Sequence, residues 1–315
     1  MTINNIFKSV SYHLIKNYRA KYIKIDSDWL SGIDTNPEKG YSIMIDSLSG
    51  NKPCMISRFG NNELDAILCY KKGHPLSFLR TTIPFWVSDA TKKRMSENAG
   101  FFPAKNKSLA KFADLCIEVS KEIDVLGAWI GYENNISEIK QSKIVPLWQL
   151  EPFWSAEPWT AVLKGKRVLV VHPFEDSIKQ QYLKRELLFE KKNTLPEFAS
   201  LHTIKAIQTV GGINNGFNSW FDALKYMEEQ IDNIDYDIAL IGCGAYGMPL
   251  AAHCKRMGKK AVHLGGALQL LFGIYGNRWL NEDQPHKQLI NEHWVRPLDK
   301  EKPKTAENIE NACYW

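Results

Sequence analysis

Short apolar runs alternate with longer amphipathic stretches along the chain, and this alternation limits the fold more than any other feature. Six runs have the length and composition of buried strands: PCMISR, DVLGAWIG, KRVLVVHP, HTIKAIQ, YDIALIG and KAVHLGG. Strands alternating with helices predict an α/β fold, here a Rossmann-like, doubly wound and mostly parallel sheet of about six strands with helices on both faces. The segment KIVPLWQLEPFWSAEPWTAVLKGK breaks this rhythm, and we expect a long ordered loop there.

Composition and charge exclude several classes of protein. The chain has 315 residues, of which 44% are hydrophobic, so it can bury a full core. No apolar run approaches the roughly 20 residues that cross a bilayer, and no secretory signal is visible. A net charge of +5 is too small for a dedicated nucleic-acid binder, so we expect no nucleic-acid partner. Six cysteines without a C-x-x-C pair favour reduced thiols and a cytoplasmic protein.

Three regions differ in their pattern. Residues 1–30 form a basic amphipathic segment, residues 31–276 carry the α/β pattern, and residues 277–315 form a polar extension that we expect to pack on the domain. The basic segment can lie on an anionic membrane surface, which would place the protein at the inner face of the membrane. It can equally dock its apolar stripe on the parent domain, and the sequence leaves both readings open.

The stretch CMISRFGNNELDAI runs from a predicted strand into a predicted helix through Gly60. Strand ends that lead into helix starts are where open α/β sheets bind ligands, because the first amides of a helix have no internal partner. Arg58 and Glu63 flank this junction and are candidates for ligand contact. Asn61 and Asn62 can simply cap the helix, so a structural role for them stays open.

A second glycine site follows the strand YDIALIG. Gly242, Gly244 and Gly247 form a G-x-G-x-x-G pattern at a predicted helix start, where a phosphate can approach the backbone. A dinucleotide site would also need an acid at the end of the next strand to hold the ribose, and that strand ends AVHLGG. The pattern therefore favours a nucleotide diphosphate, while close packing of helix on strand remains an alternative reading of the glycines.

The order of four motifs adds a resemblance. RFGNNE, LKGKRVLVVHPF, GCGAYG and VHLGG occur in sequence between residues 53 and 276, and together they resemble the GT-D type of bacterial glycosyltransferase, found in assembly of polysaccharides and glycoprotein glycans. The resemblance implies a GT-D-like catalytic domain that moves a sugar, as a hexosyltransferase does, from a nucleotide-sugar donor to a glycan or lipid-linked acceptor. The donor-binding residues it implies are Arg58, Phe59, Gly60, Asn61, Asn62, His172, Gly242, Gly244, Gly247, His263 and Gly265.

The chain departs from that family at its metal-binding motif. The family pattern R-[YF]-G-D-G-E has an aspartate where this chain has Asn61, so a Mg²⁺ or Mn²⁺ ion would be held by Glu63 and the neutral amide of Asn61, and weakly. Asp65 is an alternative second carboxylate. We expect Glu63 to be the essential acid, with Asp65 and Glu175 as further catalytic candidates; Glu175 also suits a helix start without any catalytic role.

Aromatic residues in the proline-rich segment are candidates for acceptor binding. Trp148, Trp154 and Trp159 can stack on sugar rings, or they can anchor the loop to the core, and we expect Trp154 and Trp159 to contact the acceptor. Two other functions remain as alternatives to a glycosyltransferase. One is a non-catalytic nucleotide or sugar binding protein, which fits the asparagine at position 61. The other is a SAM-dependent methyltransferase, which GCGAYG superficially suggests and the missing ribose-binding acid weakens.

Overall fold

A parallel β-sheet forms the centre of the molecule. The computed structural model describes residues 26–72, 87–281, 283–309 and 312–315. Within these residues the sheet has seven strands in the order β3-β2-β1-β7-β6-β4-β5, and every pair is parallel. The strands are β1 (Cys54–Arg58), β2 (Val125–Ala128), β3 (Lys143–Pro146), β4 (Arg167–His172), β5 (Ser200–Lys205), β6 (Ile238–Ile241) and β7 (Lys260–His263).

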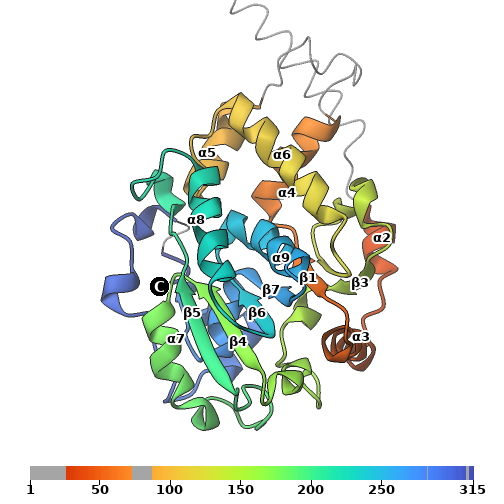
Figure 1. Cartoon of the computed structure of the whole chain (residues 1–315), viewed down its shortest axis with the longest axis vertical. Coiled ribbons are helices and arrows are strands. Elements are labelled where there is room, and N and C mark those ends of the chain that lie inside the picture. Colours follow the sequence, from red (N-terminus) through yellow and green to blue (C-terminus); the bar gives the residue numbers. More distant parts are fainter. Residues whose placement is uncertain (1–25, 73–86, 282, 310–311) are drawn as a thin grey trace, which may run out of the picture.

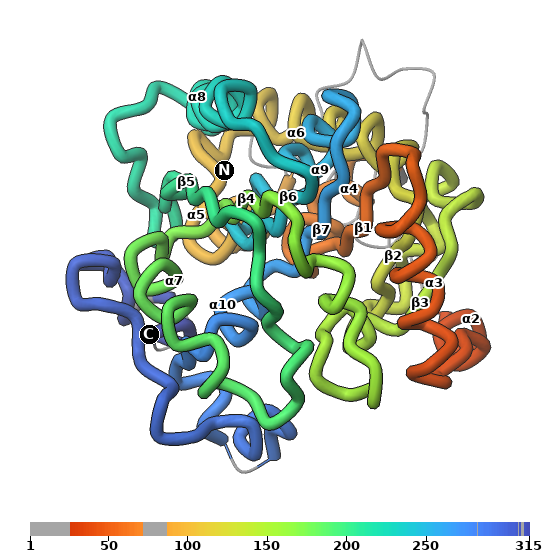
Figure 2. The backbone as a smooth tube through the Cα atoms, turned by 60° about the horizontal axis from the view of Figure 1, so that its bottom comes forward, coloured from red at the N-terminus to blue at the C-terminus, as the bar shows by residue number. Residues whose placement is uncertain are grey.

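Helices cover both faces of this sheet, as Figures 1 and 2 show. One face is covered by α4 (Asn61–Lys72), α5 (Asp89–Glu97), α6 (Asn106–Ser120), α8 (Trp220–Asp232) and α9 (Gly247–Arg256). The other face is covered by α3 (Pro37–Ser49), α7 (Glu175–Tyr182), α10 (Leu268–Leu271) and the segment that follows α10. A short helix, α2 (Ser27–Ser31), precedes α3.

Alternation along the strands explains the two cores. In β4, Leu169 and Val171 point into the core beneath α8 and α9, whereas Val168 and Val170 point into the core beneath α3 and α7. Successive side chains of a strand face opposite sides, so a strand covered on both sides must be apolar throughout. The apolar runs in the sequence are therefore the signature of a buried parallel sheet.

The predicted fold class is confirmed, with one correction to the sheet. The sequence predicts about six strands, and the described residues form seven. The missed strand is β3, which lies in the segment expected to be a loop. It is four residues long, ends in Pro146 and pairs with β2 alone. Proline is tolerated on an edge strand, where its missing amide costs no ladder hydrogen bond.

The basic segment at the N-terminus lies, up to residue 25, outside the described residues.

The C-terminal segment packs deeply into the second core. Trp279, Trp294 and Trp315 are each 4–5% exposed and belong to that core. Glu301 in this segment is 3% exposed, and its carboxylate caps the start of α7. Glu301 accepts hydrogen bonds from the amides of Asp176 and Ser177, at 2.8 and 3.3 Å, and from the Ser177 hydroxyl. This contact ties the segment to the start of α7.

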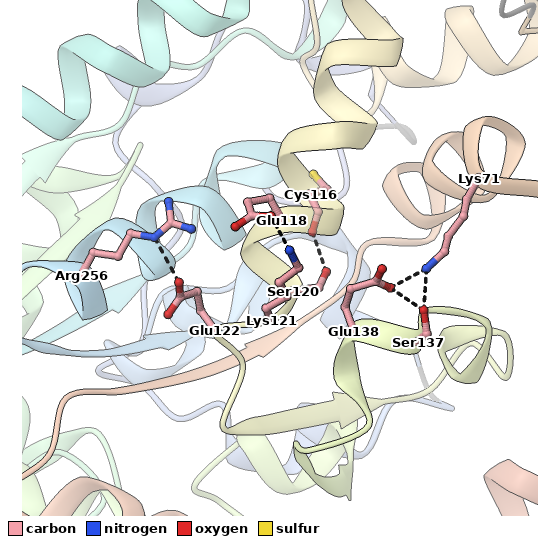
Figure 3. Close-up of polar contacts among 9 residues, drawn as sticks. All are labelled: Lys71, Cys116, Glu118, Ser120, Lys121, Glu122, Ser137, Glu138 and Arg256. Carbon is pink, nitrogen blue, oxygen red and sulfur yellow. Dashed lines mark hydrogen bonds and ion pairs between the residues drawn. The ribbon is translucent and has the colours of Figure 1, made fainter. Parts of the chain in front are cut away.

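Ion pairs anchor the far ends of two helices that begin near one edge of the sheet (Figure 3). Lys71 near the end of α4 donates to Glu138 and, at 3.0 Å, to Ser137. Arg256 at the end of α9 donates to Glu122 at 3.2 Å.

Among the described helices, none is long and apolar enough to span a bilayer. No disulfide joins the six cysteines, all of which are buried.

The Glu301 cap predicts a large effect on stability. Replacing Glu301 with alanine leaves two amides and a hydroxyl without their acceptor in a buried place, which should lower the free energy of unfolding by roughly 2–4 kcal/mol. Chemical denaturation measures this. Glu307→Ala is the matched control, since Glu307 is exposed and its ion-pair partner among the described residues is the exposed Lys302, and it should change stability by less than about 0.5 kcal/mol. Equal stability of the two variants would contradict the capping role.

Candidate functional site

A cavity of about 220 Å³ opens at the carboxyl edge of the sheet. Four neighbouring strands, β1, β7, β6 and β4, end there, and each contributes a residue at or just beyond its last position. These residues are Arg58, His263, Gly242 and His172. The chain changes direction across the sheet between these strands, because β2 and β3 lie on one side of β1 whereas β7, β6, β4 and β5 lie on the other. Open α/β sheets bind their ligands at such a switch point.

Arg58 is the central cation of the cavity. Its guanidinium carbon lies 5.2 Å from the centre of the Trp129 ring, and its Nε is buried without a hydrogen-bond partner among the described residues. Burial lowers the pKa of this arginine, and the charge of Glu63 opposes that shift. Gly265 makes room for the guanidinium, because a Cβ on Gly265 would lie 2.8 Å from Arg58 Nη1 and its φ is +64°. An unpaired buried donor next to a void is suited to an incoming anion.

A second arginine reaches the cavity from the C-terminal segment. Arg278, in the 3₁₀ helix Asn277–Leu280, lies over the Tyr314 ring at 4.7 Å and donates to its hydroxyl at 3.2 Å. Both side chains line the cavity. The positive charge of Arg278 acts on Arg58 and lowers its pKa further. Two cations that repel each other across one cavity strengthen its attraction for a polyanion.

Glu63 is the acid that faces these cations. It stands in the first turn of α4, and its carboxylate folds back over Gly60, where a Cβ would lie 2.0 Å from Glu63 Oε2. Gly60 is therefore required for this arrangement. Burial raises the pKa of the Glu63 carboxyl, while the charge of Arg58 lowers it. Asn61 and Asn62 line the cavity beside Glu63, and Asn61 is exposed.

Two histidines line the cavity as neutral rings. Burial lowers the pKa of His172 to about 3 and, together with the charge of Arg58, that of His263 to about 3. His172 Nδ1 accepts the amide hydrogen of Phe174 at 3.0 Å, so the neutral ring carries its proton on Nε2. No described residue accepts from that nitrogen, which leaves it as a hydrogen-bond donor for a ligand. His263 Nδ1 pairs instead with the Ser57 hydroxyl at 3.0 Å.

The three glycines of the second motif do different work. A Cβ on Gly242 would lie 2.8 Å from the His172 ring, and one on Gly247 would lie 2.2 Å from His263 Nε2, so both allow the histidines to pack closely. Gly244 adopts a φ of +59°, and its Cβ would meet only ordinary contacts. It opens the 3₁₀ turn Gly244–Tyr246 before α9, and the first amide of α9, that of Gly247, donates to the Gly244 carbonyl, so a ligand could reach only the amides of the turn itself. Gly242 and Gly247 therefore serve close packing, whereas Gly244 is the glycine of this motif that a ligand could approach.

Trp129 is held rigidly at the mouth of the cavity by a buried acid. Glu133 has no exposed surface, and its carboxylate accepts the amide hydrogens of Trp129, Ile130 and Gly131 at 2.7–2.8 Å. The indole nitrogen of Trp129 donates to the carbonyl of Phe59 at 3.0 Å. These bonds fix the ring that lies over Arg58.

Five of the predicted site residues lie away from the cavity lining. Asp65 pairs with Arg94 at 2.9 Å, and Glu175 accepts hydrogen bonds from Lys179 and Thr203. Phe59 and Trp159 have no exposed surface and pack in the two cores. Trp154 donates to Glu151 at 2.9 Å. The remaining predicted residues surround one cavity: Arg58, Gly60, Asn61, Asn62, Glu63, His172, Gly242, Gly244, His263 and Gly265, with Gly247 behind His263.

Sequence reasoning missed Trp129, Arg278 and Tyr314. The signal for Trp129 was its place at the end of the DVLGAWIG run, next to a strand end. Nothing local marks Arg278 or Tyr314, because they reach the cavity only through the packing of the C-terminal segment.

The residues present fit a resident divalent cation poorly. Among the described residues no group of three or more histidine, cysteine, aspartate or glutamate side chains could hold a metal ion. The cavity offers Glu63 and the neutral Asn61, and Arg58 stands close enough to act on the same carboxylate. Hard cations such as Mg²⁺ bind oxygen sites more weakly as carboxylates are lost.

Comparisons with known proteins give one match. No protein-family model matches the chain, and no curated protein matches it. A solved structure described as the selenomethionine-substituted structure of domain of unknown function 1792 matches with a TM-score of 0.40 and 12% identity, covering 92% of this chain and 96% of that chain.

The two neutral histidines predict a loss of stability in acid. Their folded pKa values of about 3 lie below the unfolded value of roughly 6.5, so the unfolded chain binds more protons as the pH falls between these values. Each histidine should then cost about 1.4 kcal/mol per pH unit below about pH 6. Denaturation at a series of pH values measures the slope.

Asparagine retains the acceptor position of Nδ1 but has no proton to gain, so His172→Asn should reduce that slope whatever its effect on stability at neutral pH. An unchanged slope in His172→Asn would show that this ring is not held neutral by the fold.

Proposed function

We propose that the chain is a glycosyltransferase that binds the diphosphate of a nucleotide sugar in the cavity and passes the sugar to a glycan or lipid-linked acceptor, as in synthesis of a surface polysaccharide or glycoprotein glycan. The observation that carries the proposal is the charge of the cavity. Among the described residues two arginines and the carboxylate of Glu63 line it, and the two histidines are neutral. Such a site lacks negative charge, which an anionic ligand would supply.

The leaving group of sugar transfer is a nucleoside diphosphate, which gains negative charge as the glycosidic bond breaks. Arg58, with its unpartnered Nε, and Arg278 would stabilise that charge. The amides of the 3₁₀ turn Gly244–Tyr246 and the Nε2 proton of His172 would add neutral donors. Because Glu63 is the only acidic side chain that lines the cavity among the described residues, we assign this stabilisation to the arginines.

Glu63 would act as the base that takes the proton of the acceptor hydroxyl. A useful base has a pKa near the working pH, and burial moves the pKa of Glu63 upward from its ordinary value. Arg58 limits the shift and would keep the carboxylate ionised when the donor is bound.

The same charges bear on the alternatives. The methyl donor of a SAM-dependent methyltransferase carries a sulfonium cation, which two arginines would repel. A non-catalytic binding protein would need the arginines but would have no use for Glu63, so a role for Glu63 separates this alternative from a glycosyltransferase.

Attraction of the N-terminal segment to an anionic membrane remains a proposal that suits a lipid-linked acceptor.

Binding of nucleoside diphosphates tests the proposal. A panel of diphosphates and their sugars should raise the thermal unfolding temperature, and Arg58→Gln should weaken the best ligand by roughly tenfold to a hundredfold, as expected for a lost hydrogen bond to a charged group. Isothermal titration gives the affinities. Arg94→Gln is the matched control, because Arg94 pairs with Asp65 away from the cavity, and its affinity should equal the wild type. Equal loss in both variants would contradict the assignment.

Catalysis should depend on pH through Glu63. The base works in its ionised form and has a raised pKa, so release of nucleoside diphosphate from the donor should fall as the pH drops, at a higher pH than an ordinary glutamate would give. Arg58→Gln removes the charge that opposes this shift, so the acidic limb should move to still higher pH.

Glu63→Gln should bind the nucleotide and release none from the donor. Full turnover in Glu63→Gln would remove Glu63 from the mechanism while leaving nucleotide binding intact. Binding without any turnover in the wild type would favour the non-catalytic reading.

A further inference from the structure

Two exposed tryptophans border one groove beside the cavity. Trp129 is 42% exposed and Trp148 is 37% exposed, and every other tryptophan of the described residues is less exposed than these two. Tryptophan is usually well buried, so two exposed indoles in one concavity are informative. The groove has a volume of about 420 Å³ and is lined between them mainly by apolar residues, among them Leu30, Ile33 and Pro146.

Trp129 belongs to the groove and to the cavity alike. It covers Arg58 at 5.2 Å, and Glu133 fixes its backbone through three amide hydrogen bonds. A ligand in the groove would therefore lie next to the site where the donor sugar is expected. The two sites share a wall that the fold holds in place.

Polar groups in the groove point to the chemistry of its ligand. The Trp148 indole nitrogen and the Thr35 hydroxyl have no hydrogen-bond partner among the described residues, and both residues are exposed. Glu151 adds a carboxylate that accepts from His286 at 2.7 Å and from Trp154 at 2.9 Å through the same oxygen, Oε2. Indole faces suit the C–H faces of a sugar ring, and the polar groups suit its hydroxyls. A hydrocarbon tail would contact the indole faces but would leave the polar groups of the groove without a partner.

We infer that this groove is the acceptor subsite and holds a pyranose ring of the acceptor glycan between Trp129 and Trp148. The inference rests on the proposed function. It keeps Trp148 from the aromatic residues of the proline-rich segment and replaces Trp154 and Trp159 with Trp129. The acceptor hydroxyl would then enter the cavity past Trp129, toward Glu63.

Saturation-transfer NMR with a panel of methyl pyranosides tests the subsite on the full chain. At least one pyranoside should show transfer to its ring protons in the wild type, and Trp148→Ala should weaken its binding by about tenfold or more, the order expected for a lost aromatic face and hydrogen bond. Trp148 lines the groove and not the cavity, so nucleotide affinity should stay unchanged. Tyr226→Ala, which removes an exposed aromatic ring from α8, is the matched control and should bind the sugar as the wild type does.

Equal sugar binding by Trp148→Ala and the wild type would overturn the inference, and so would a panel without any transfer. Displacement of the methyl pyranoside by the dodecyl glycoside of the same sugar at a much lower concentration, with saturation transfer to its alkyl protons, would also overturn the inference. That result would show that the groove binds a lipid tail and not a sugar ring. The nucleotide titration on the same samples separates these outcomes from a failure of the proposed function, since a chain that binds a diphosphate but no pyranoside keeps its donor site.

Discussion

Removing a guanidinium from water is costly unless an anion or a hydrogen-bond acceptor replaces the solvent, and Arg58 receives little of either from its own chain. Trp129 covers one side of it, Glu63 acts on it as a charge, and its Nε has no partner among the described residues. Because the fold keeps the Arg58 Nε without a partner, an anionic ligand that accepts its hydrogen bond should bind favourably. His172 adds a neutral donor to the cavity, because its Nδ1 accepts from the Phe174 amide and the ring therefore carries its proton on Nε2.

The rest of the molecule holds that arginine in position. β1 places it at the carboxyl edge of the sheet, where β4, β6 and β7 also end, and the glycines at 60, 242, 247 and 265 remove the side chains that would collide with Glu63, the histidines and the guanidinium. The C-terminal segment closes the cavity with Arg278 and Tyr314, and Glu301 fixes that segment to α7. Stability and ligand binding are therefore coupled through the same contacts.

Much of this arrangement could be predicted from the sequence. Apolar runs located six strands, and the carboxyl ends of parallel strands meet at one edge, so Arg58, His172, Gly242 and His263 had to gather there. Strand β3 could not be predicted because its apolar pattern is short and ends in proline. Arg278 and Tyr314 could not be predicted because tertiary packing alone brings them to the cavity. Whether Glu63 has a catalytic role stays a prediction, since geometry gives its place and its raised pKa but not its reaction.

A crystal structure of the chain with a nucleoside diphosphate would show whether Arg58 is the group that binds the anion. We expect phosphate oxygens within hydrogen-bond distance of Arg58 Nε and of the Arg278 guanidinium, with the nucleotide lying across the carboxyl ends of β1, β7 and β6. A nucleotide bound elsewhere, or one bound in the cavity that leaves Arg58 Nε without a partner, would contradict this role of Arg58.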